Sequence, residues 1–141
     1  MSADVDWSAL IEEATKARTR AYSPYSGFSV GAAITDASGK VFSGANVENA
    51  SYGATICAER VALTAAISSG AGAPTALVIV TGAEEPTPPC GICRQVIAEF
   101  SPKCVIRAYA QDGTYEQWRL DELLPSSFRS SHFGGDSEEG V

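Results

Sequence analysis

The sequence predicts an α/β fold in which one mixed sheet carries helices on its faces. Helical and strand patterns alternate along the chain, and residues 76–81 form a continuous apolar run typical of a buried strand. The 141 residues are 45 % hydrophobic and 19 % charged, which suits a single globular domain spanning 1–141. A chain of this length can bury on the order of 70 % of its unfolded surface.

The first half of the chain is expected to form one helix and a β-hairpin. Residues 7–20 carry apolar side chains at helical spacing, and Asp6 is a suitable N-cap. The stretch 22–27, which contains Pro and Gly, ends this helix. Strands are predicted at 28–34 and 40–47, joined by a turn of Asp, Ala, Ser and Gly.

The second half alternates helices with strands. A helix is predicted over 55–69, ended by a Gly- and Pro-rich stretch and followed by the strand 76–81. After a loop with three prolines, residues 91–100 can form a third helix. Further strands are expected at 104–110 and 114–118, separated by an Asp-Gly turn. The chain closes with a helical turn at 120–124 and a polar segment, 126–141, whose end is expected to be flexible.

Charge and composition exclude several classes of partner. The net charge of −7 opposes binding to nucleic acid, which requires clustered Lys and Arg, and it suits a small neutral substrate. No apolar run approaches the ~20 residues of a membrane span, so no membrane partner is expected. The amino-terminal residues lack the basic and apolar regions of a signal peptide, which predicts a cytoplasmic location. In that reducing compartment the four cysteines are better interpreted as metal ligands or core thiols than as disulfides.

Two short segments carry the candidate chemistry: Cys57-Ala58-Glu59-Arg60 and Pro89-Cys90-Gly91-Ile92-Cys93-Arg94-Gln95. Cys90 and Cys93 are three residues apart at the start of a predicted helix, so both thiols project to one side. Cys57 opens the preceding predicted helix, and a metal off the helix ends lies within reach of all three. Three thiolates can hold a zinc ion and leave its fourth coordination position for water. The segments therefore predict a metal-activated water and hydrolytic chemistry.

Glu59 is the candidate proton carrier, because a carboxylate beside such a water can accept and return protons. Three thiolates outweigh the charge of the dication by one, which would make the water less acidic. Two helix N-termini and the neighbouring Arg60 would offset this surplus. We expect Arg60 to donate hydrogen bonds to a ligand thiolate, and Gln95 to lie beside the ligand set.

Two structural interpretations compete with a catalytic metal. Cys104 would complete a closed, inert four-thiolate site, or all four cysteines would be core thiols. The alternating strand pattern around Cys104 favours a packed thiol. Glu59 would then merely complement the helix dipole. The single histidine, His132, has no metal-site context in the sequence.

With these segments the chain resembles the small homotetrameric, zinc-dependent cytidine deaminases, in which a Cys₃ zinc site with a non-ligand Glu is a known pattern. The resemblance covers roughly residues 7–128 and rests on four blocks in order. It implies a three-layer α/β/α fold with one mixed five-stranded sheet, a homotetramer, and one Zn²⁺ per subunit. The blocks are Pro24-Tyr25-Ser26-Gly27-Phe28-Ser29-Val30-Gly31-Ala32-Ala33, Asn46-Val47-Glu48-Asn49-Ala50-Ser51-Tyr52, the two cysteine segments, and Glu122-Leu123-Leu124-Pro125-Ser126-Ser127-Phe128.

The resemblance also implies roles for single residues. Cys57, Cys90 and Cys93 would bind the zinc, and Glu59 would be the general acid/base. The implied reaction is hydrolytic deamination of cytidine and 2′-deoxycytidine to uridine and 2′-deoxyuridine with release of ammonia, a step of pyrimidine salvage. The implied substrate contacts are Phe28 beside the base, Asn46 and Glu48 on the ribose hydroxyls, the main chain of Ala58 on the pyrimidine edge, Tyr52 near an intersubunit site, and Phe128 from a neighbouring subunit.

Other interpretations stay open beside the resemblance. Phe28 at the start of a strand would ordinarily be core, and Phe128 a hydrophobic anchor. A blasticidin-type aminonucleoside deaminase is the nearest alternative, although the Asn46–Glu48 block favours the plain nucleoside. A structural zinc module that binds a partner is the alternative from another class. It predicts that Glu59 is buried or turned away from the metal, that Cys104 lies within bonding distance of the metal, and that there is no pocket.

Overall fold

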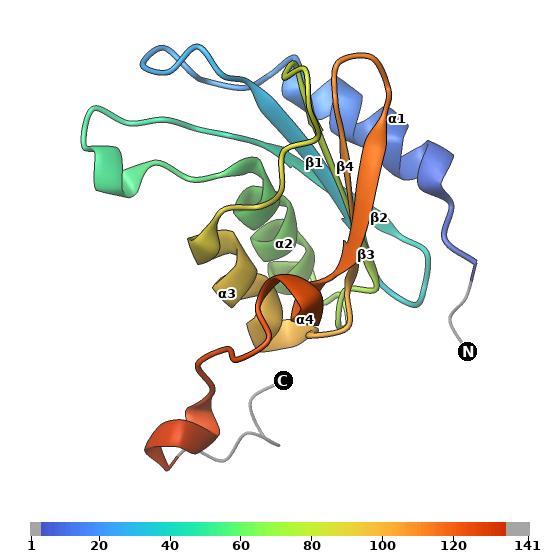
Figure 1. Cartoon of the computed structure of the whole chain (residues 1–141), viewed down its shortest axis with the longest axis vertical. Helices are drawn as coiled ribbons and strands as arrows, with labels where there is room; N and C mark the ends of the chain where they lie inside the picture. Colours follow the sequence, from blue (N-terminus) through green and yellow to red (C-terminus); the bar gives the residue numbers. More distant parts are fainter. Residues whose placement is uncertain (1–3, 135–141) are drawn as a thin grey trace.

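The computed structural model describes residues 4–134, and a mixed five-stranded sheet forms its middle layer (Figure 1). The strand order is β2-β1-β3-β4-β5, with β3 parallel to β4 and the other neighbours antiparallel. The predicted sheet is thereby confirmed. Its strands are β1 (Val30–Thr35), β2 (Val41–Ala45), β3 (Ala76–Thr81), β4 (Val105–Tyr109) and β5 (Tyr115–Arg119).

Helices cover both faces of the sheet, which gives the expected three layers (Figure 1). Helix α1 (Trp7–Arg18) packs on one face, whereas α2 (Ala58–Ser68), α3 (Gly91–Phe100) and the short α4 (Leu120–Leu123) lie on the other. Successive residues of a strand point to opposite faces. In β3, Val78 therefore joins the core under α1, and Leu77 joins the core under α2 and α3.

Two glycines let the helices approach the sheet closely. A Cβ on Gly31 of β1 would overlap main-chain atoms of Ala14 and Arg18 in α1. A Cβ on Gly44 of β2 would lie 2.7 Å from the main-chain nitrogen of Ala62 in α2. Both positions thus require the absence of a side chain, and the second seats α2 against the sheet.

Most element boundaries agree with the prediction. The predicted ranges 76–81 and 91–100 match β3 and α3, and Asp6 is the N-cap of α1, where its carboxylate accepts from Ala9 N at 3.1 Å. The prediction that a strand begins at Phe28 is wrong, because β1 begins at Val30. The carbonyl of Phe28 accepts from the Asn46 side chain at 2.8 Å, so this part of the chain is a loop fixed by a side chain.

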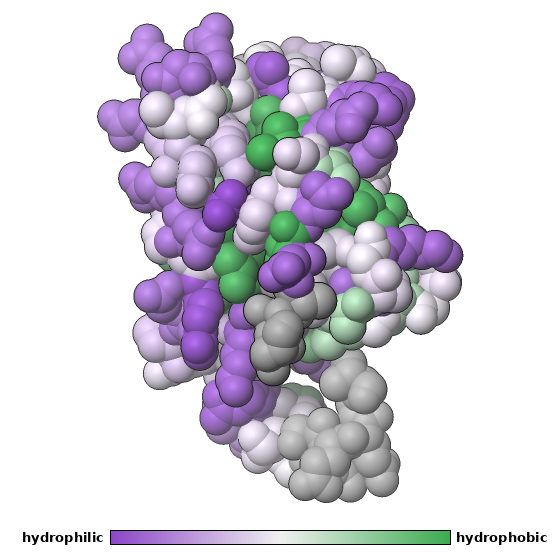
Figure 2. Space-filling view, turned by 90° about the vertical axis from the view of Figure 1, so that its right-hand side faces the viewer, coloured by the Kyte–Doolittle hydropathy of each residue, from purple (hydrophilic) through white to green (hydrophobic). Residues whose placement is uncertain are grey.

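Two single 3₁₀ turns lie outside the sheet and the α-helices: η1 (Tyr52–Ala54) and η2 (Ser130–Phe133). The flexible end that we predicted concerns residues 135–141, which lie outside the described part. Figure 2 shows the right-hand side of Figure 1, where hydrophilic residues predominate and hydrophobic ones form small, separate patches. Within residues 4–134, none of the helices has the length and apolar character needed to cross a membrane.

Candidate active site

Three cysteine sulfurs converge where α2 and α3 begin on the same face of the sheet. Cys57 is the N-cap residue of α2, Cys90 is the N-cap residue of α3, and Cys93 lies in the first turn of α3. Their sulfurs all lie within 4.8 Å of one another, and those of Cys57 and Cys90 are 3.7 Å apart. A tetrahedral zinc ion with Zn–S bonds of about 2.3 Å needs sulfurs about 3.8 Å apart. The donor set therefore fits zinc.

The surroundings favour a thiolate at Cys57 and a thiol at Cys93, whose pKa is raised by its hydrogen bond to Cys57 and by burial. The Cys93 thiol and, less strongly, Arg60 lower the pKa of Cys57 to about 5. The Nη2 atom of Arg60 lies 3.7 Å from the Cys57 sulfur, which is the contact that we expected from the sequence. The N-termini of both helices add partial positive charge at the same place. Because thiolates are the form that binds metal, Cys57 is already in the binding form, and a cation that joins the cluster would displace the proton of Cys93.

Glu59 lies in the first turn of α2, next in the chain to the Cys57-Ala58 pair, and only 6 % of it is exposed. Burial raises the pKa of its carboxyl group to about 7. A group that titrates near neutral pH can both accept and donate a proton there. Glu59 therefore has the character of a general acid/base.

A cavity of about 270 Å³ joins Glu59, Cys57 and Cys90 to four more of the predicted residues. Its lining comes from five separate parts of the chain: the 26–30 loop and strand, the 46–48 loop, residues 55–59 at the start of α2, residues 79–81 of β3, and the 87–90 loop. The structure thus brings Phe28, Asn46, Glu48 and Ala58 into one hollow with Glu59, Cys57 and Cys90.

Asn46 holds one wall of this cavity through two hydrogen bonds. Its Oδ1 accepts from Val30 N at 2.9 Å, and its Nδ2 donates to Phe28 O at 2.8 Å. Phe28 is consequently displayed at the cavity with 39 % of its surface exposed, so it is not a core residue. The amide of Asn46 keeps one further N–H for a ligand.

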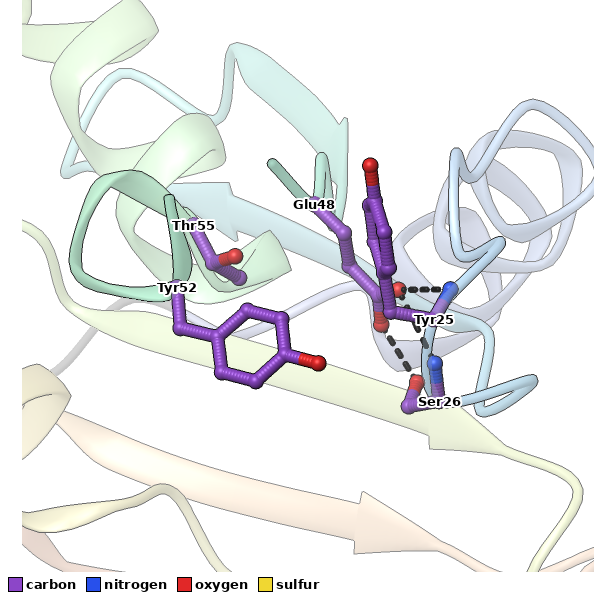
Figure 3. Close-up of a pocket in the computed structure, with 5 residues that line it drawn as sticks. All are labelled: Tyr25, Ser26, Glu48, Tyr52 and Thr55. Carbon is purple, nitrogen blue, oxygen red and sulfur yellow. Dashed lines mark hydrogen bonds between the residues drawn. The ribbon is translucent and has the colours of Figure 1, made fainter. Parts of the chain in front are cut away.

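Glu48 lies between this cavity and a second one of about 360 Å³, which Tyr25 and Tyr52 also line (Figure 3). Glu48 is buried, with 8 % of the residue exposed. Its carboxylate accepts hydrogen bonds from the main-chain nitrogens of Tyr25 at 2.9 Å and Ser26 at 3.1 Å. The Ser26 hydroxyl bonds its other oxygen and is the main cause of the lowered pKa of Glu48. The ring of Tyr52 is 75 % exposed and packs edge-on to Tyr25.

Two predicted residues lie elsewhere. Phe128 is 61 % exposed, stacks on Phe133 with ring centres 5.6 Å apart, and lines neither cavity of its own chain. Gln95 holds this segment, because its amide donates to Phe128 O at 2.8 Å and accepts from Phe128 N at 3.2 Å. Gln95 therefore contacts the carboxy-terminal segment, whereas we had expected it beside the metal ligands.

Cys104 is fully buried in the core under α2 and α3 and does not belong to the sulfur cluster. Burial raises its pKa to about 12, so it stays a neutral thiol. The interpretation of Cys104 as a fourth ligand is wrong, and with it the closed structural zinc site.

The sequence analysis missed two polar residues that line both cavities, Ser26 and Thr55. Ser26 stands in a turn before Gly27, whose φ of +69° is left-handed. The sequence offered one signal for Ser26: it is a hydroxyl residue between Pro24 and Gly27, two positions before the candidate wall residue Phe28. Thr55 precedes Cys57 by two residues, and its hydroxyl accepts from Asn49 N at 3.1 Å.

Comparison with known proteins agrees with this geometry. Residues 5–108 match the family described as the cytidine and deoxycytidylate deaminase zinc-binding region. The chain is 47 % identical to a cytidine deaminase of Halalkalibacterium halodurans over 88 % of this chain and 95 % of that protein. It is 40 % identical to a cytidine deaminase of Sporosarcina psychrophila, over 96 % of this chain and all of that protein.

A solved structure shows the same fold. The crystal structure of cytidine deaminase from Burkholderia pseudomallei superimposes with a TM-score of 0.82 at 45 % identity, covering 86 % of this chain and 98 % of that one. A blasticidin-S deaminase of Bacillus cereus is more distant, at 28 % identity over 84 % of this chain and 89 % of that protein.

Proposed function

Because this chain belongs to the zinc-binding cytidine deaminase family, we propose that it hydrolyses cytidine and 2′-deoxycytidine to uridine and 2′-deoxyuridine, with release of ammonia. The observation that carries the proposal is one cavity that Glu59 lines together with two of the three cluster cysteines, Cys57 and Cys90. The cavity also presents an aromatic wall, Phe28, and polar groups suited to a sugar. Such a site has the parts that nucleoside hydrolysis requires.

Cys57, Cys90 and Cys93 would hold the zinc ion. When bound, zinc acts as a Lewis acid that lowers the pKa of water and so supplies a nucleophile near neutral pH. Glu59 takes a proton from the water and delivers it to N3 of the pyrimidine. After the oxygen has added to C4, Glu59 takes the second proton from that hydroxyl and carries it to the amino group, and the C4–N bond breaks to give ammonia and the C4 carbonyl. One carboxylate serves all these transfers because it alternates between charged and neutral forms.

Substrate contacts follow from the cavity lining. Phe28 lies against the base, and the main chain of Ala58 holds the pyrimidine edge at the start of α2. Asn46 and Glu48 bind the sugar hydroxyls, with the carboxylate as the acceptor. A phosphate on the same sugar edge would be repelled by Glu48, which restricts the site to free nucleosides.

We further propose that the protein is a cytoplasmic homotetramer in which Phe128 and Tyr52 of one subunit contribute to the site of another. The large exposed fractions of both rings support this, because apolar groups of this size are commonly covered in an assembly. Four free cysteines suit a reducing compartment.

An absorbance assay tests the function. The purified protein should convert cytidine and 2′-deoxycytidine, lose this activity on treatment with a zinc chelator, and regain it with added zinc. Blasticidin S, assayed in parallel, should react far more slowly. Turnover of blasticidin S in the absence of cytidine turnover would assign the site to the antibiotic instead.

A further inference from the structure

Ser26 lines both cavities, and Figure 3 shows it beside Glu48, to which it is hydrogen-bonded. It belongs to the turn that precedes Phe28, and its neighbour Gly27 provides the left-handed backbone that closes the turn. The main-chain nitrogen of Gly27 donates to Ser23 O at 2.9 Å, which fixes the turn from the other side.

The Glu48 carboxylate depends on this turn. It has no ion pair with any cation in residues 4–134, and a buried carboxylate without a cation needs hydrogen-bond donors. The Tyr25 and Ser26 nitrogens both bond Oε1, and the Ser26 hydroxyl bonds Oε2. A carboxylate has about four acceptor positions, so three are occupied and one is left for a ligand.

Among the hydrogen bonds in residues 4–134, the Ser26 hydroxyl is the donor that reaches the second oxygen of Glu48. The two main-chain donors hold Oε1, whereas the hydroxyl holds Oε2, the oxygen that keeps the remaining acceptor position. The same hydroxyl oxygen accepts from Phe28 N at 3.0 Å. One side chain thus links the sugar-side carboxylate to the base-side aromatic wall.

We propose that Ser26 is a positioning residue for nucleoside recognition, whose hydroxyl orients Glu48 so that its remaining acceptor position meets a sugar hydroxyl. This inference rests on the proposed function. Ser26 acts through Glu48, and it takes no part in proton transfer at the base. Its loss should weaken binding and leave the chemical step intact.

The test uses the full-length, zinc-loaded enzyme and two substrates, cytidine and 2′,3′-dideoxycytidine, which lacks the hydroxyls that Glu48 would bind. For Ser26→Ala, KM for cytidine should rise about tenfold with kcat within about twofold of wild type, as expected for a lost hydrogen bond to a charged group. With the dideoxynucleoside, KM of variant and wild type should agree within about twofold, since the hydroxyl contact is missing in both. Ser26→Thr keeps a hydroxyl and should restore KM for cytidine to within about threefold.

Ser23→Ala is the matched control, because Ser23 lies in the same turn but pairs with the Ser29 hydroxyl at 2.8 Å and does not bond Glu48. Its kinetics should be those of wild type. An unchanged KM in Ser26→Ala, an equal KM increase with both substrates, or a Ser26→Ala protein that no longer folds would overturn the assignment. A wild-type protein that leaves cytidine unreacted would overturn the proposed function as well, whereas an active wild type with a normal Ser26→Ala variant would overturn only the role of Ser26.

Discussion

Replacement of Glu59 by Gln should abolish turnover and leave the protein folded and able to bind zinc. Gln keeps the size of the side chain, which is 6 % exposed at the start of α2, but it cannot accept and return a proton. Each proton transfer by a positioned group contributes about 10²–10⁴ in rate, and the proposed reaction routes several transfers through this carboxylate.

Within residues 4–134, Glu48 is the one other carboxylate that lines the cavity, and the 25–26 turn occupies three of its acceptor positions, so it is a poor substitute for Glu59. We therefore expect kcat for cytidine to fall by at least about 10⁴, or about 5.4 kcal/mol at 1.36 kcal/mol per factor of ten.

The assay is the absorbance change of cytidine on deamination, with zinc content and thermal unfolding measured on the same samples. Zinc should remain stoichiometric, because the ligands are sulfurs. Glu99→Gln, on the exposed side of α3, is the matched control and should retain full activity. A Glu59→Gln enzyme with kcat within tenfold of wild type would remove Glu59 from the mechanism.

Three further predictions concern the frame and the specificity of the site. Gly31→Ala should lower the free energy of unfolding by about 1–3 kcal/mol, because the added Cβ overpacks against α1. Gly53→Ala is the control in thermal unfolding, since a Cβ at Gly53 has no atom within 4 Å. Equal melting temperatures of the two variants would contradict the packing argument. Hydrogen bonds from Ser38 and Gly72 lower the pKa of Asp36, so its charged form should stabilise the protein above the unfolded pKa of about 4, and this stability should be lost as the pH falls through the lower folded pKa. Asp36→Ala should therefore lower the melting temperature at pH 7 but not in strong acid. A decrease that is the same at both pH values would refute the charge argument. Cytidine 3′-monophosphate, whose phosphate replaces a hydroxyl that Glu48 would bind, should be deaminated at least about 100-fold less efficiently than cytidine, and comparable kcat/KM values would exclude this role of Glu48.

Local sequence signals accounted for most elements of the fold. Strand β3 and helix α3 have the predicted bounds, because nearby residues set both. A continuous apolar stretch defines β3, and α3 is flanked by Pro on one side and by Ser-Pro on the other. The start of β1 was misplaced because Asn46, 18 positions from Phe28, takes the backbone carbonyl that a strand would have used. Such a contact depends on the tertiary fold and leaves no periodic pattern.

The residues of the candidate site likewise divide into those that local sequence signals predict and those that only tertiary contacts bring together. The Cys57, Cys90 and Cys93 spacing predicted a convergent sulfur cluster, and the structure confirms it with a fit to zinc. The dual bond of Ser26 to Glu48 and Phe28 N was not predictable, because it depends on the path of a loop. The partnership of Gln95 with Phe128 likewise requires α3 and the carboxy-terminal segment to meet in space.

Zinc-edge X-ray absorption on the purified protein tests most directly whether the metal keeps a vertex for reactive water. We predict one zinc per chain, bonded to three sulfurs at about 2.3 Å and to one oxygen at about 2.0 Å. A shell of four sulfurs, or protein that holds no zinc after loading, would contradict the mechanism at its foundation.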